Sequence, residues 1–254
     1  MCSSKPLDEL HMVQLWMDTK RMAELSKALS LPPHTDLNYL VHCALGKLFQ
    51  EHAPKPFAVE DHPGRRGRFV RVLGYAGLPA DGLHEMAKAF AEPMAYEICD
   101  FERMAAKPMP DRFPDGVRLG FEARVCPVLR KASDSEKWRK GDEVDVFLDK
   151  AWAVGDEVEL DRKEIYEAWF SERIAAHGGA RILDAKVTRF SLEKMVRRTS
   201  GKMRKAKTFT RPAATLSGRL EVQDGMRFQD LLGRGIGRHK SFGFGMVKVR
   251  RLRS

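Results

Sequence analysis

The stretch LGRGIGRHKSFGFG, from Leu232 to Gly245, interleaves five glycines with arginine, lysine and histidine. A strand-like apolar segment, Met246 to Val249, follows it. Glycine permits positive φ and close backbone approach, and backbone amides beside fixed cations suit a phosphate or a nucleic-acid backbone. The stretch therefore indicates a polyanion site. A glycine-rich turn with merely solvated basic residues is the alternative.

Two familiar phosphate loops do not fit this stretch. A dinucleotide fingerprint leaves a strand and opens a helix, whereas here a short helical run, Met226 to Leu232, leads in and a strand leads out. A P-loop needs glycine directly before Lys-Ser, and His239 stands before Lys240 instead. Neither nucleotide site is predicted.

Positive charge is concentrated around the same stretch. The whole chain has a formal net charge of +10, and residues 193–254 hold 17 Lys and Arg against 4 Asp and Glu. The rest of the chain has 28 basic and 31 acidic residues. Clustering of this kind is typical of a nucleic-acid surface, although acidic membranes and acidic proteins also attract it.

The first half of the chain has the element order of a ferredoxin-like domain. Apolar periodicity and capping residues predict a strand, a helix, two strands, a helix and a long strand. These elements are Glu9 to Met17, Asp36 to about Gln50, Phe57 to Glu60, Arg68 to Tyr75, Asp81 to Ala91 and Gly116 to Leu129, with proline-rich irregular sequence before the last. We assign this domain to residues 1–129.

The second half is predicted to be a trimmed copy of the same fold. Residues 130–161 are charged and form a connector or insertion, with a short helix near Asp145. Residues 162–254 give a helix from Arg162 to Ala176, strands at Arg181 to Arg189 and Thr208 to Val222, and a short helix capped by Asp224. The fold class is therefore α+β, with two tandem ferredoxin-like (RRM-like) domains.

Thiols, histidines and hydropathy limit the class of protein. Cys2, Cys43, Cys99 and Cys126 form no C-x-x-C pair and are expected to be reduced thiols. No signal peptide or membrane span is evident, so we expect a soluble, cytoplasmic protein with no membrane partner. No metal site is predicted, since five histidines lack metal-ligand spacing: His11, His34, His52, His62 and His84.

The C-terminal third resembles the CasE-type CRISPR repeat-RNA endoribonucleases. The resemblance rests on Leu216 to Val222 and on the loop from Gly233 to Gly245, and extends more weakly to Trp169–Ile174 and the helix from Asp36 to Phe49. It implies tandem ferredoxin-like domains and metal-independent cleavage, without a cofactor, at the 3′ base of a repeat hairpin. The 2′-hydroxyl attacks the adjacent phosphate and leaves a 2′,3′-cyclic phosphate. The resemblance also implies that the mature guide RNA is retained in a multi-subunit surveillance complex.

The family's catalytic pattern Y-x-x-H-x-x-L-x-x-L-F matches Tyr39 to Phe49. The resemblance therefore implies His42 as general acid or base and Tyr39 as its helper. Helical spacing puts both on the non-core face, with open space over Gly46 where RNA can approach, while Lys47 projects elsewhere. A histidine pKa near 6.5 suits proton transfer at neutral pH. The alternative is a surface histidine beside an ordinary packing tyrosine.

The resemblance also implies two RNA-contacting regions. A basic tip between the last long strands matches by location, and its alternative is a solvated loop; its residues are Arg197, Arg198, Lys202, Arg204, Lys205 and Lys207. In the glycine-rich stretch the expected contacts are Arg234, Gly235, Gly237, Arg238, Lys240, Gly243 and Gly245. Two other functions remain open, a noncatalytic RNA-binding subunit of a CRISPR ribonucleoprotein and a small-molecule phosphate enzyme.

Overall fold

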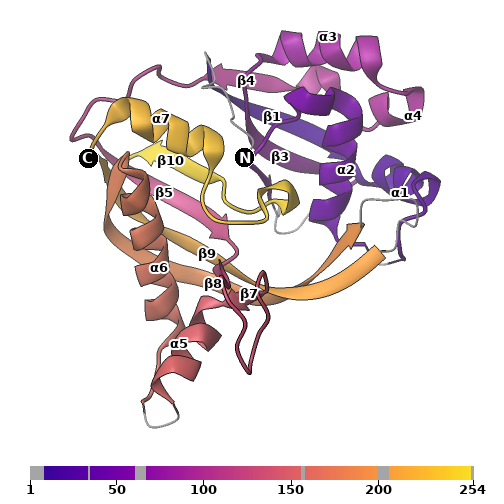
Figure 1. Cartoon of the computed structure of the whole chain (residues 1–254). Coiled ribbons are helices and arrows are strands. Elements are labelled where there is room, and N and C mark those ends of the chain that lie inside the picture. Colours follow the sequence, from indigo (N-terminus) through magenta and orange to yellow (C-terminus); the bar gives the residue numbers. More distant parts are fainter. Residues whose placement is uncertain (1–8, 34, 61–66, 156–157, 199–205, 253–254) are drawn as a thin grey trace.

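The computed structural model describes residues 9–33, 35–60, 67–155, 158–198 and 206–252, and at 197, 198, 206 and 207 it describes the backbone alone. Two four-stranded antiparallel sheets, each covered by helices, form the two halves of the molecule (Figure 1). The yellow C-terminal loop in Figure 1 runs from the second half toward the helices of the first.

The first sheet has the order β2-β3-β1-β4. Its strands are β1 (His11–Asp18), β2 (Phe57–Glu60), β3 (Phe69–Ala76) and β4 (Ala105–Pro108). Apolar side chains alternate along β1, so that Val13, Leu15 and Met17 lie on one face and are fully buried. The helices of this half are α1 (Thr19–Ala28), α2 (Leu37–Phe49), α3 (Ala80–Phe90) and α4 (Pro93–Tyr96), with short 3₁₀ turns η1 (Gln50–His52) and η2 (Phe101–Arg103). Side chains from α1, α2 and α3 share one hydrophobic core with this face.

The second sheet has the order β10-β5-β9-β8. Its strands are β5 (Arg118–Val125), β8 (Ala180–Arg198), β9 (Ala206–Val222) and β10 (Val247–Arg251). Helices α6 (Arg162–His177) and α7 (Gly225–Arg234) pack against it, and Phe170, Phe228 and Leu231 are fully buried there. The order of connection and pairing is that of a complete ferredoxin-like unit, so the expected fold of two tandem units is confirmed.

One strand belongs to a different sheet from the one expected. We expected Gly116 to Leu129 to close the first domain, but β5 pairs with β9 and β10 and thus opens the second. The four-residue strand β4 closes the first sheet on β1 instead, within the sequence that we expected to be irregular. It ends at Pro108, which an edge strand tolerates because one side of the strand needs no ladder hydrogen bonds. The second unit is therefore complete rather than trimmed.

The charged segment 130–161 lies between β5 and α6. It contains β7 (Glu143–Asp145), which pairs with β6 (Val128–Arg130), and α5 (Val146–Val154). Asp145 caps α5 by accepting a hydrogen bond from the Phe147 amide at 2.8 Å, and the Tyr166 hydroxyl donates to the same carboxylate at 2.8 Å. The hydrogen bond between Tyr166 and Asp145 thus holds the segment against α6, the helix that follows it in the chain.

Candidate functional site

The glycine-rich loop packs directly against α2. The ring of Phe242, in the short 3₁₀ turn η3 (Lys240–Phe242), lies 5.5 Å from the Tyr39 ring and 5.8 Å from the His42 ring, measured between centroids. Tyr39 is only 7% exposed and His42 is partly buried. The α2 face that we expected to be open at both residues is therefore covered by the loop at Tyr39. Open space remains over Gly46, where an added Cβ would meet nothing within 4 Å.

Helix α2 is placed by a cap that the sequence predicts. The Asp36 carboxylate accepts a hydrogen bond from the Tyr39 amide at 2.9 Å and so fixes the first turn of the helix. Tyr39 and His42 are three residues apart, so their rings lie on neighbouring parts of one face, 5.9 Å apart between centroids. Because of this spacing, the Phe242 ring contacts both the Tyr39 ring and the His42 ring.

The loop's glycines serve close packing within the protein. Gly235 and Gly243 are buried, and a Cβ on them would approach the Pro56 Cγ and the Asn38 Oδ1, each at 2.7 Å. Only glycine adopts such a backbone without strain. All four predicted glycines have positive φ: Gly235 65°, Gly237 76°, Gly243 75° and Gly245 82°. They let the loop pack closely against α2 and against the residues at the start of β2. Gly235, Gly243 and Gly245 are buried and do not face solvent.

Several loop amides are already hydrogen-bonded within the chain. The Gly235 amide donates to the Leu231 carbonyl at 2.7 Å, Ile236 to Gly245 at 2.8 Å and Gly245 to Arg124 at 2.7 Å. A phosphate cradle needs such amides free to point at the ligand. This arrangement argues against the small-molecule phosphate enzyme.

Arg124 on β5 anchors the other end of the loop. It donates to the Gly243 carbonyl at 3.2 Å, and its guanidinium lies 4.1 Å from the centre of the Phe244 ring. It also forms an ion pair with Glu193 of β8. One arginine thus joins the loop to the long β8–β9 hairpin, which extends toward α1 and α2 in Figure 1.

Beside the loop, Lys55 lies close enough to His42 and to Lys240 for its charge to act on both. Burial lowers the pKa of His42 below its ordinary value, and the nearby positive charge of Lys55 lowers it further. Burial also lowers the pKa of Lys240, with Lys55 and Arg234 as the next causes. Like charges held together in this way favour an anion between them. Lys55 was not predicted from the sequence, because it belongs to no recognisable motif.

The other predicted RNA contacts have varied surroundings. Arg234 is exposed and forms an ion pair with Asp230 at 2.6 Å, whereas Arg238 is paired with Glu143. Lys47 points to Glu92, with Nζ and Oε1 2.8 Å apart, away from His42 as its helical position predicts. Of the basic tip, Lys202, Arg204 and Lys205 lie outside the described residues, as do the side chains of three others: Arg197, Arg198 and Lys207.

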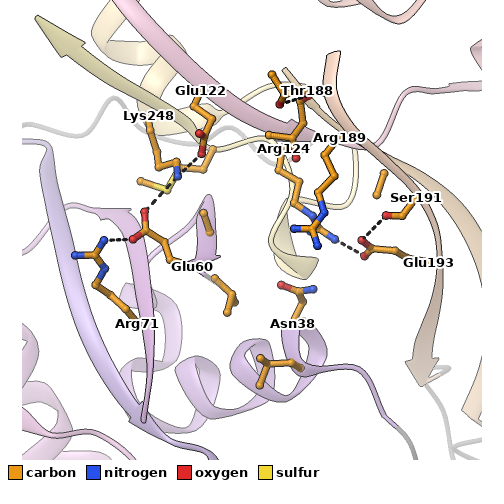
Figure 2. A pocket seen from close by; sticks show the side chains of 16 residues that line it. Asn38, Glu60, Arg71, Glu122, Arg124, Thr188, Arg189, Ser191, Glu193 and Lys248 are labelled. Carbon is orange, nitrogen blue, oxygen red and sulfur yellow. Dashed lines mark hydrogen bonds and ion pairs between the residues drawn. The ribbon is translucent and has the colours of Figure 1, made fainter. Parts of the chain in front are cut away.

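A polar cleft of about 670 Å³ lies between the two sheets, next to the start of α2 (Figure 2). Its charges are largely paired with one another: Glu60 binds Arg71 and also Lys248 at 3.2 Å, and Lys248 binds Glu122 at 2.5 Å. Asn38 of α2 is one of the side chains that line it, labelled in Figure 2. The cleft therefore joins the two halves through ion pairs.

Among the described residues, no three His, Cys, Asp or Glu side chains are grouped so that they could hold a metal ion. The described cysteines, Cys43, Cys99 and Cys126, form no disulfide with one another. None of the helices in the described parts of the chain has the length and apolar run that a bilayer crossing needs.

Comparison with known proteins places the fold. The chain is similar to CRISPR endoribonuclease Cse3 bound to a 19-nucleotide RNA (TM-score 0.60, 21% identity, 95% of this chain and 99% of that chain). It is also similar to the CRISPR-associated protein Cas6e of Escherichia coli strain K-12 (TM-score 0.55, 19% identity, 95% and 100%). A chain of a CRISPR RNA-guided surveillance complex gives a TM-score of 0.57 at 15% identity, covering 95% and 100%.

A search of curated proteins returned no match to the sequence. The family described as CRISPR-associated protein, in contrast, matches residues 10–251, nearly the whole of the described fold. With the tandem ferredoxin-like architecture and the C-terminal glycine-rich loop in place, the chain belongs to the CRISPR-associated protein family.

Proposed function

We propose that this chain is a metal-independent endoribonuclease that processes CRISPR precursor RNA in the cytoplasm. It cleaves at the 3′ base of the repeat hairpin, keeps the mature guide RNA and joins a multi-subunit surveillance complex. The similar folds of Cse3 and Cas6e, and of a chain in an RNA-guided surveillance complex, support this class of function.

One observation carries the catalytic part of the proposal. The C-terminal loop seats Phe242 against His42 and so brings Lys240 into the same basic group as His42 and Lys55. A general base and two cations therefore lie in one neighbourhood, since the charge of Lys55 acts on both His42 and Lys240. Cleavage of a phosphodiester needs a base for the attacking hydroxyl and positive charge for the phosphate oxygens.

The chemistry divides among these residues as follows. Neutral His42 takes the proton from the 2′-hydroxyl, whose oxygen then forms a bond to phosphorus. The bond from phosphorus to the 5′ oxygen breaks, and that oxygen takes a proton from water. Lys55 offers positive charge to the phosphate oxygens, Lys240 holds the RNA backbone beside them, and the 2′,3′-cyclic phosphate remains on the product. Tyr39, which is buried and stacked on Phe242, orients His42.

RNA binding extends from this place along the basic C-terminal region. Arg234 is exposed beside the loop, and the long β8–β9 hairpin leads to the basic tip. Phosphate contacts of this kind hold an A-form stem by its shape and charge. The alternative function, a noncatalytic RNA-binding subunit, is favoured by the contact of Phe242 with the His42 ring, since that contact leaves less room for a scissile phosphate.

A repeat RNA labelled at its 5′ end tests the proposal in EDTA. His42→Ala should lower the single-turnover cleavage rate by about 10² to 10⁴, the usual contribution of a general base, without weakening RNA binding. His52→Ala is the matched control, because His52 lies in the turn that follows α2, with its Nε2 3.7 Å from the Glu51 carboxylate. Equal cleavage by His42→Ala and wild type would contradict the assignment. Binding without cleavage by either protein would favour the noncatalytic subunit.

A further inference from the structure

One carboxylate of the inserted segment 130–161 holds the glycine-rich loop. Glu143 begins β7, and its side chain is 12% exposed. Its carboxylate forms an ion pair with Arg238. It also accepts hydrogen bonds from His239 Nε2 at 2.7 Å and from Arg211 of β9 at 3.1 Å. Two of its three partners are consecutive residues of the loop.

The electrostatics show how firmly the charge is held. Hydrogen bonding to His239 lowers the pKa of Glu143 to about 2, with Arg238 adding to the effect against the opposing effect of burial. Glu143 is therefore ionised throughout the neutral range. A buried anion with several charge-assisted partners fixes their positions more strongly than an exposed ion pair.

The residue held in this way has a costly backbone. His239 has φ 60°, a left-handed conformation that is strained for a non-glycine residue. Its carbonyl accepts the Phe242 amide at 2.8 Å, which closes η3, and its ring lies 6.0 Å from the Phe242 ring. Phe242 in turn contacts His42. A chain of direct contacts therefore runs from Glu143 through His239 and Phe242 to the proposed base.

We propose that Glu143 is a positioning residue for the site at His42. By holding His239, the inserted segment sets the place of Phe242 and Lys240 against α2. This inference rests on the proposed function for its kinetic effect. The geometric part, that Glu143 holds the loop in place, stands without it.

Glu143 also occupies Arg238, which gives the proposal a distinctive sign. Removing the carboxylate frees a cation on an RNA-facing loop, so RNA binding should stay equal or become tighter while cleavage slows. A purely structural role would weaken both together. A role as a shield of Arg238 would tighten binding and leave the rate unchanged.

The experiment compares Glu143→Gln with Glu221→Gln in the full chain. Glu221 is a matched control, since its side chain is 13% exposed and accepts from Arg118 and Arg181 at the far end of the sheet. At saturating RNA, Glu143→Gln should slow single-turnover cleavage by roughly 10- to 100-fold, as a small misplacement of a site does. Glu143→Asp, which keeps the charge, should recover part of the rate. Glu221→Gln should cleave and bind as wild type does.

Hydrogen exchange of residues 235–245 gives a second readout that needs no cleavage. Exchange should rise in Glu143→Gln and not in Glu221→Gln. A wild-type cleavage rate in Glu143→Gln would overturn the inference. So would a loss of RNA binding in Glu143→Gln as large as its loss of rate, or the same losses in Glu221→Gln. If wild type does not cleave, the proposed function fails, and the exchange result alone decides: no rise in the loop would overturn the positioning role as well.

Discussion

The ring of Phe242 stacks on the ring of Tyr39, with 5.5 Å between centroids and 13° between planes. Tyr39 lies on the first long helix of the N-terminal half, and Phe242 lies in the turn before the last strand of the C-terminal half. The candidate site is therefore built by both ferredoxin-like units together. Neither unit on its own supplies His42, Lys55 and Lys240.

The first prediction concerns this aromatic contact. Phe242→Ala should lower the free energy of unfolding by about 1 to 3 kcal/mol, because it removes a partly buried ring from the junction of the two halves. Cleavage should slow as the loop loses its seat on α2. Phe90→Ala, at a ring that is 58% exposed on α3, should change the free energy of unfolding by less than about 0.5 kcal/mol. Urea unfolding measures both, and equal losses would contradict the prediction.

The second prediction concerns pH. Burial and the charge of Lys55 disfavour protonated His42, so its pKa in the folded protein lies below its ordinary value. The neutral base therefore persists to lower pH, and the single-turnover rate should fall only below about pH 6.5. Lys55→Gln removes one of the two causes and should move this acid limb to higher pH. Lys27→Gln, at the end of α1, is the control. A rate that falls as pH rises through this range would make His42 an acid instead.

The third prediction separates two costs of a substituted glycine. Gly245 and Gly116 both have positive φ, at 82° and 79°. An added Cβ would collide with the Ile236 carbonyl at Gly245 and meet nothing within 4 Å at Gly116. Gly116→Ala should therefore cost about 1 kcal/mol of stability from backbone strain alone, and Gly245→Ala clearly more. Equal melting temperatures for the two variants would contradict this packing role for the loop glycine.

The fourth prediction concerns the two loop cations expected to contact RNA. Lys240 lies beside other cations, whereas Arg238 is paired with Glu143. Lys240→Ala should weaken RNA binding more than it slows cleavage at saturating RNA, and should reduce the slope of log K against log salt by about 1. Arg238→Ala should change the slope less. A larger change of the salt slope in Arg238→Ala than in Lys240→Ala would contradict this prediction and would mean that RNA displaces Glu143 from Arg238.

Local elements were predictable because their signals are local. Either Thr35 or Asp36 was expected to cap α2, and Asp224 to cap α7; Asp36 and Asp224 accept hydrogen bonds from first-turn amides. The strand at Gly116 to Leu129 was found, but its sheet was wrong. Periodicity shows that a strand is buried and does not show which partners it pairs with, since β5 meets β9 and β10 only through long-range contacts.

The site was predictable in part for the same reason. The spacing of Tyr39 and His42 on one helix face follows from helical geometry. The cover of that face by Phe242 does not, because the loop is far away in the sequence. Glu143 and Lys55 were missed, since each joins the site through the tertiary fold and belongs to no motif.

The most direct test of the central claim removes the attacking oxygen from the substrate. Once the cleaved bond has been mapped on repeat RNA in EDTA, the same RNA is made with a single 2′-deoxy nucleotide on the 5′ side of that bond. The protein should bind both RNAs with equal affinity and cleave only the all-ribose RNA, to a product ending in a 2′,3′-cyclic phosphate. Cleavage of the 2′-deoxy RNA at the mapped bond would contradict attack by the 2′-hydroxyl.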